Sequence, residues 1–261
     1  MTYRILFLDI DGTILKADHT YTDSTKEAIE QAKKKGIDVF LATGRPRHEI
    51  RELAKELNIH SCIASNGAYA EFNEQTIIEE PLDTEIIHSF LEAAKMHGFD
   101  MVLYANDKNY FTSFDTPAVQ TFLDTFQLTT NALWHPDVKA NILGVTLIGV
   151  DDDSLKHLSV PTGIHLSPVH VGDVQDAYDI IRQNVNKGQA VQKVLETMNI
   201  SQTVAIAFGD GMNDKEMLQV VGEGFAMGNA HPDLFSYAKH RTNTVDDSGI
   251  YNGLKQLGVI D

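Results

Sequence analysis

Cysteine, basic side chains and long apolar runs are all scarce in this sequence of 261 residues. Its single cysteine, Cys62, excludes a disulfide within the chain and predicts a reducing compartment such as the cytoplasm. Because Ile63 and Ala64 follow it, we interpret Cys62 as a small buried side chain. No apolar stretch approaches the ~20 residues that cross a bilayer, so we expect no membrane partner.

The shortage of basic residues excludes further classes of protein. Lysine and arginine number 21 against 37 acidic residues, which gives a formal net charge of −16. Such a chain is a poor binder of nucleic acid or anionic lipid. An anionic substrate would therefore need local attraction, and a bound cation with a few hydrogen-bond donors would supply it.

Apolar runs and helical patterns alternate at both ends of the chain. Residues 5–8 and 37–42 read as buried strands, with a helical pattern between them that Gly36 ends. A strand near residues 62–64 follows, and residues 203–208 form another apolar run. Strands that alternate with helices predict an α/β fold, with a doubly wound parallel sheet of the Rossmann type.

The middle of the chain has a different rhythm. Helical patterns at 84–97 and 117–126 stand among short alternating segments that read as strands. We therefore predict that residues 82–183 form an α+β domain inserted into a core made of residues 1–81 and 184–261.

Unusual polar residues follow the predicted core strands or open the next helix. In an open parallel sheet, ligands bind at the carboxyl ends of the strands, where loops and helix starts point their donors. These residues are Asp9, Asp11, Thr43, Gly44, Lys187, Asp210, Asn213 and Asp214. Each alone has an ordinary reading as a turn, a helix cap or a solvated lysine. Their joint occurrence at strand ends favours one shared site.

In these motifs the sequence resembles the haloacid dehalogenase superfamily, specifically the Cof-like phosphatases with a type IIB α/β cap. The resemblance rests on residues 9–13 (DIDGT), 41–45 (LATGR), 187–188 (KG) and 209–214 (GDGMND). These motifs span nearly the whole chain, and the insertion lies between the second and third, where that subgroup carries its cap. The resemblance implies a doubly wound core with an inserted cap that sets substrate specificity.

The resemblance also implies catalytic roles. Asp9 would attack phosphorus and form an aspartyl-phosphate, while Asp11 would act as general acid and then as general base. Mg²⁺ would bind the carboxylates of Asp9 and Asp210 together with the backbone carbonyl of Asp11.

The remaining motif residues would hold the phosphate. Lys187 would contact both Asp9 and the phosphate, and Thr43 and Gly44 would donate hydrogen bonds to phosphoryl oxygens. Asn213 would contact the phosphate end of the substrate. Asp214 would support Lys187 or the metal site without direct contact to the substrate.

The expected activity is hydrolysis of small phosphomonoesters such as sugar phosphates, so the expected partner is a small phosphorylated metabolite. A sugar phosphomutase is the nearest alternative, because it would use the same intermediate and the motifs do not separate the two. A phosphometabolite-binding protein without turnover is another alternative. The presence of both Asp9 and Asp11 speaks against it, since binding alone needs no general acid.

Overall fold

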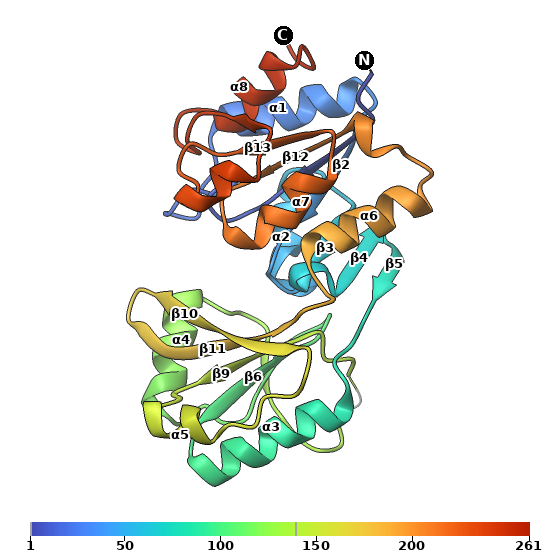
Figure 1. The fold of residues 1–261 in the computed structure, drawn as a ribbon. Coiled ribbons are helices and arrows are strands. Elements are labelled where there is room, and N and C mark those ends of the chain that lie inside the picture. The colour runs from blue at the N-terminus through green and yellow to red at the C-terminus, as the bar shows by residue number, and fades with distance from the viewer. Residues whose placement is uncertain (1, 139) are drawn as a thin grey trace. The chain divides into compact units, whose positions relative to one another are not determined.

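The computed structural model describes residues 2–138 and 140–261, and the chain divides into two compact units (Figure 1). The core unit contains the chain up to Arg45, Arg51–Ile78 and Asn186–Asp261. The cap unit contains Pro46–Ile50 and Glu79–Val185. The insertion expected at residues 82–183 lies within the cap unit.

The core sheet has the strand order β14-β13-β12-β1-β2-β3-β4-β5. Neighbours from β14 to β3 pair in parallel, and β4 pairs antiparallel with β3. The strands are β1 (Ile5–Leu8), β2 (Asp38–Ala42), β3 (Cys62–Ala64), β4 (Tyr69–Phe72), β5 (Gln75–Glu79), β12 (Ala205–Gly209), β13 (Glu223–Ala226) and β14 (His240–Arg241).

Helices cover both faces of the core sheet. On one face α1 (Asp23–Lys34) lies beside α8 (Gly249–Gln256), and on the other α6 (Lys187–Thr197) lies beside α7 (Lys215–Val220) (Figure 1). The short helix α2 (Arg51–Glu56) also belongs to this unit. Phe7 and Val191 share a buried cluster on the α6 face, whereas Gly253 of α8 approaches the ring of Phe208 closely. The predicted doubly wound α/β core is therefore confirmed.

The cap sheet has the strand order β10-β11-β9-β6-β7-β8, and only β7 and β8 pair in parallel among the described strand pairs of this sheet. Its strands are β6 (Asp100–Tyr104), β7 (Asn109–Phe111), β8 (Asn131–Leu133), β9 (Gly144–Ile148), β10 (Ile164–Val171) and β11 (Val174–Arg182). Its helices are α3 (Thr84–His97), α4 (Pro117–Phe126) and α5 (Asp152–His157).

Each face of the cap sheet has its own apolar cluster. Leu103 and Leu147 pack with Phe90 of α3, while Phe111 and Ile148 pack with residues of α4. Alternation along the strands explains this division, since successive side chains point to opposite faces. Within the described residues, no helix combines the length and apolar character needed to cross a membrane.

A short segment that follows core strand β2 belongs to the cap unit. Residues 46–50 include a 3₁₀ turn, η1 (Arg47–Ile50), and they cluster with the cap unit although β2 and α2 on either side belong to the core. The Nδ1 of His48 donates to the carbonyl of Ala105 (3.1 Å). The carboxylate of Glu49 accepts from the side chain of Asn109 (2.7 Å). These contacts attach the segment to the β6–β7 turn.

Candidate active site

The polar residues expected from the sequence gather where parallel core strands end. Asp9 directly follows β1, Thr43 follows β2, and Asp210 follows β12. Since β1 lies between β2 and β12, the sheet topology brings these positions to one edge. Lys187 is the first residue of α6, and Asn186 caps that helix by accepting from the backbone N–H of Gln189.

Lys187 is the centre of the charge arrangement. Its Nζ donates to Oδ1 of Asp9 (2.6 Å) and to Oδ1 of Asp214 (2.6 Å). Lys187 and Asp214 have no exposed surface, and Asp9 is 6% exposed. A lysine so deeply buried is stable as a charge only when it is paired, so these two bonds fix its position.

The second oxygen of Asp214 is also occupied. Oδ2 accepts from the backbone N–H groups of Asp210 and Gly211, each at 3.0 Å. Gly209 makes this turn possible, because a Cβ there would lie 2.6 Å from the Cβ of Asp214. Asp214 therefore braces Lys187 and the loop after β12.

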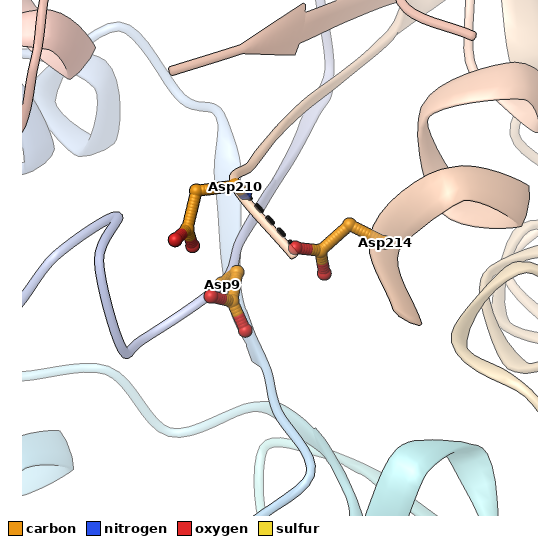
Figure 2. A group of neighbouring side chains, drawn as sticks. All are labelled: Asp9, Asp210 and Asp214. Atoms are coloured by element: carbon orange, nitrogen blue, oxygen red, sulfur yellow. Dashed lines mark hydrogen bonds between the residues drawn. The ribbon is translucent and has the colours of Figure 1, made fainter. Parts of the chain in front are cut away.

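Asp210 completes a cluster of carboxylates with Asp9 and Asp214 (Figure 2). Its Oδ1 accepts from the hydroxyl of Thr13 (3.1 Å). Gly12 lies against it with φ +77°, and a Cβ at Gly12 would come within 2.1 Å of Oδ2 of Asp210. Residue 12 must therefore be glycine both for its left-handed backbone and for this close approach.

The cluster holds more negative charge than Lys187 balances. Burial raises the pKa of Asp9 well above its usual range, repulsion from Asp214 raises it further, and Lys187 opposes both effects. Burial and the charge of Asp214 raise the pKa of Asp210 to about 6. Burial lowers the pKa of Lys187, but the two carboxylates outweigh it and the net shift is upward, so Lys187 stays protonated.

This donor set fits a divalent cation. One oxygen from each of Asp9, Asp210 and Asp214 lies within 4.8 Å of the others. Carboxylate oxygens are the ligands that Mg²⁺ prefers, and a cation would relieve the repulsion that raises the two aspartate pKa values. Because both oxygens of Asp214 are already hydrogen-bonded, Asp9 and Asp210 are the side chains best able to hold it.

Asp11 is not a member of this carboxylate cluster. It is 51% exposed, and its carboxylate accepts from Nε of Arg45 at 2.8 Å and from Nη2 of the same side chain. The guanidinium thus grips the carboxylate through two donors.

Thr43 and Asn213, two of the residues expected to bind phosphate, follow different core strands. The Oγ1 of Thr43 accepts from the backbone N–H of Arg45 (3.1 Å), which leaves its hydroxyl proton available. Asn213 lies in the 3₁₀ turn η4 (Met212–Asp214), and its Nδ2 donates to Oδ1 of Asn66 (3.1 Å).

Asn66 is a site residue that the motifs did not indicate. A Cβ on Gly44 would lie 3.1 Å from both terminal atoms of Asn66, so this side chain lies against the loop after β2 as well as touching Asn213. Ser65 and Asn66 both have positive φ, at 50° and 52°. Such a conformation is uncommon outside glycine and is retained mainly where the surroundings impose it. Serine, asparagine and glycine are typical turn residues, but the sequence does not predict this strain.

Comparison with known proteins identifies the family. The sequence pattern of the haloacid dehalogenase-like hydrolases matches residues 6–254. The chain belongs to this family. It is 30% identical over 263 residues to YkrA of Bacillus subtilis, a protein provisionally named a phosphatase, with all of both chains covered.

Solved structures agree with this assignment. A hypothetical protein of Geobacillus kaustophilus matches with a TM-score of 0.91 and 30% identity, covering 99% of this chain and 100% of that one. A subclass IIB sugar phosphatase, BT4131, has the same fold with a TM-score of 0.82, 24% identity and coverage of 98% and 100%. The predictions of a capped haloacid dehalogenase-like fold and of an enzyme of the phosphatase class are confirmed.

Proposed function

We propose that this chain is a Mg²⁺-dependent phosphatase that hydrolyses small phosphomonoesters, with sugar phosphates or similar metabolites as its substrates, through an aspartyl-phosphate on Asp9. The observation that carries the proposal is the contact of Lys187 with Asp9 in a buried site. The ammonium favours the ionised, nucleophilic form of Asp9 and adds positive charge where a phosphate must bind. The low proportion of basic residues elsewhere makes this local charge important.

A divalent cation would be held by Asp9 and Asp210, together with the backbone carbonyl of Asp11. It would supply positive charge that offsets the repulsion between a phosphate dianion and the carboxylates. Thr43 and Gly44 would donate to phosphoryl oxygens through a hydroxyl and a backbone N–H, and Asn213 would contact the phosphate end of the substrate.

Two displacements at phosphorus then complete hydrolysis. A carboxylate oxygen of Asp9 forms a bond to phosphorus while the bond to the ester oxygen breaks. Asp11, which must first leave the Arg45 guanidinium and take up a proton, gives that proton to the departing alkoxide. Asp11, now ionised, takes a proton from water as that water attacks the phosphoryl group. The bond from phosphorus to Asp9 breaks, and the carboxylate of Asp9 and inorganic phosphate are released.

The double role of Asp11 gives a direct test with the variant Asp11→Asn. A sugar alkoxide leaves poorly without a proton, so both displacements should slow by ~10²–10⁴-fold. p-Nitrophenol leaves readily, so with p-nitrophenyl phosphate the second displacement should suffer most. Rapid mixing should show a burst of nitrophenol, and intact-mass measurement should find the phosphoryl group on the protein.

Asp9→Asn is the matched control, because its amide is a poor nucleophile and should give neither a burst nor a mass increase. Equal slowing of sugar and aryl substrates in Asp11→Asn, with no covalent phosphate, would count against Asp11 as the acid–base residue. Transfer of the phosphoryl group to a second sugar, without release of phosphate, would favour a phosphomutase instead. Absence of any metal-dependent turnover would favour a binding protein.

A further inference from the structure

One exposed side chain of the core unit, Asn229, joins two loops that are far apart in the sequence. Asn229 lies in a turn after β13 that is closed by a hydrogen bond from the N–H of Ala230 to the carbonyl of Met227 (3.0 Å). Its Nδ2 donates to the carbonyl of Gly12 (2.8 Å), and its Oδ1 accepts from the backbone N–H of Val245 (2.8 Å). A backbone N–H can only donate and a carbonyl can only accept, so the orientation of the amide is unambiguous.

The contact with Gly12 fixes one peptide unit in the loop after β1. The carbonyl of Gly12 accepts from Asn229, while the N–H of Thr13 donates to the carbonyl of Ile10 (3.3 Å). The carbonyl and the N–H belong to the same planar peptide group, so these two bonds hold that plane from both sides. Asn229 therefore helps to orient both residues that the peptide joins, Gly12 and Thr13.

These two residues contact the two carboxylate oxygens of Asp210. The hydroxyl of Thr13 donates to Oδ1 (3.1 Å), and Thr13 has no exposed surface. The backbone of Gly12 lies so close to Oδ2 that a Cβ at Gly12 would be 2.1 Å from that oxygen. Rotation of the peptide between Gly12 and Thr13 would therefore disturb both contacts of the Asp210 carboxylate.

The segment that contains Asn229 also holds the backbone of Asp210. The N–H of His231, two residues after Asn229, donates to the carbonyl of Asp210 (2.9 Å). The turn is itself attached to a further loop, because the N–H of Gly228 donates to the carbonyl of Asn243 (2.8 Å). Residues 228–231 thus connect the backbone of Asp210 and the surroundings of its carboxylate to one anchored turn.

We propose that Asn229 is a positioning residue for the metal site: by holding the Gly12–Thr13 peptide, it sets the direction in which Asp210 presents its carboxylate to a divalent cation. Hydrogen bonds that orient a ligating carboxylate commonly contribute 10- to 100-fold to metal affinity. Asn229 acts through Gly12 and Thr13 and lies outside the sequence motifs. The inference rests on the metal-dependent phosphatase function proposed above.

The first test measures Mg²⁺ binding directly, by isothermal titration calorimetry of the full chain with MgCl₂. Asn229→Asp keeps the shape of the side chain and the acceptor for Val245, but places an oxygen against the carbonyl of Gly12. Asn229→Ala removes both hydrogen bonds. The dissociation constant for Mg²⁺ should rise about tenfold in each variant. The negative charge added by Asn229→Asp would favour a cation, so weaker binding in that variant reports the lost donor.

Phosphate release from p-nitrophenyl phosphate gives a second measurement. The Mg²⁺ concentration for half-maximal activity should rise by the same factor, whereas kcat at saturating Mg²⁺ should recover most of its wild-type value because Asp9, Lys187 and Asp210 are intact. Loss of folded protein would lower kcat instead. Because Asn229 is exposed, both variants should fold, and hydrogen exchange of the β1 and β12 amides in EDTA checks this.

Asn252→Asp is the matched control. The amide of Asn252, on α8, donates to Oδ1 of Asn243 (3.1 Å) and to the carbonyl of Asp247 (3.0 Å). The same chemical change there loosens the loop that anchors Asn229, and it should leave the Mg²⁺ dissociation constant unchanged. In a Thr13→Val background, Asn229→Asp should weaken Mg²⁺ binding less than it does in the wild type, because the contact through which it acts is already lost.

Folded Asn229→Asp and Asn229→Ala with the Mg²⁺ affinity of the wild type would overturn the inference. Equal weakening in Asn252→Asp would also overturn it, since the effect would then belong to the loop at residues 243–247. Failure of the proposed function looks different. Calorimetry would then still show Mg²⁺ binding that depends on Asn229, but the wild type would release no phosphate from p-nitrophenyl phosphate.

Discussion

Removal of the Lys187 ammonium should strongly destabilise the core unit. The variant Lys187→Met keeps most of the side-chain volume but leaves Asp9 and Asp214 buried without the cation that both contact at 2.6 Å. Lys187 and Asp214 have no exposed surface, so solvent screening does not reduce the effect. Loss of one partner from such a pair costs about 3–5 kcal/mol, a large part of a typical stability of ~5–15 kcal/mol.

The position of the single tryptophan gives the experiment an internal reference. Trp134 packs in the cap unit, so its fluorescence reports the unfolding of that unit. Hydrogen exchange of the β1 and β12 amides, measured with EDTA present, reports the core. Lys187→Met should weaken protection of these amides and leave the Trp134 transition nearly unchanged. Lys193→Met is the matched control, because Lys193 is exposed on the same helix.

A double-mutant cycle separates pairing from packing. Asp214→Asn removes one of the charges left unpaired by Lys187→Met, so the double variant should be more stable than the sum of the single effects predicts. The coupling should be at least ~2 kcal/mol, within the range for residues in one buried network. Additive effects, or a cost below ~1 kcal/mol for Lys187→Met, would refute the view that Lys187 neutralises the buried carboxylates.

Two further predictions concern the metal and the cap. Excess EDTA should abolish phosphate release, and added Mg²⁺ should restore it. The variant Asp210→Ala should stay nearly inactive even at saturating Mg²⁺. Full activity in the presence of chelator would contradict the proposed role of the metal. Burial raises the pKa of Asp179 above the ordinary carboxyl value, so the native state holds this proton more tightly than the unfolded state. The stability that this proton adds to the cap unit is fully present below pH ~4 and is lost as pH rises through the folded pKa. The stability of the cap unit, measured from Trp134 fluorescence, should therefore fall more with rising pH in the wild type than in Asp179→Asn. Parallel pH profiles of the two proteins would contradict this prediction.

Local signals account for the part of the structure that the sequence predicted. The run at β1 has a continuous apolar pattern, and α3 and α4 begin at capping residues and have clear helical periodicity. The structure brings Asp9, Lys187, Asp210 and Asp214 together because a parallel sheet gathers strand ends at one edge. The motif order along the chain was therefore enough to predict a shared site, although the individual catalytic roles remain predictions.

Features that depend on distant pairing were not predictable in the same way. Strand β11 carries Asp176 and Asp179, which weaken the strand pattern, and it is stabilised by pairing with β10 and β9. The contact of Asn66 with Asn213 joins two turns from separate parts of the sequence. Residues 46–50 likewise belong to the cap unit because Glu49 accepts a hydrogen bond from Asn109, which lies far away in the sequence. Sequence patterns predict which face of a helix or strand is buried and where the element ends. They do not predict which side chain from a distant part of the sequence will contact it.

The core cluster attracts a ligand only locally. The ammonium of Lys187, together with a cation held by the carboxylates of Asp9 and Asp210, would favour the dianionic end of a phosphomonoester. Full charges close to the phosphate act far more strongly than the screened, distant charges of the surface. This difference explains how a chain with net charge −16 could bind an anion.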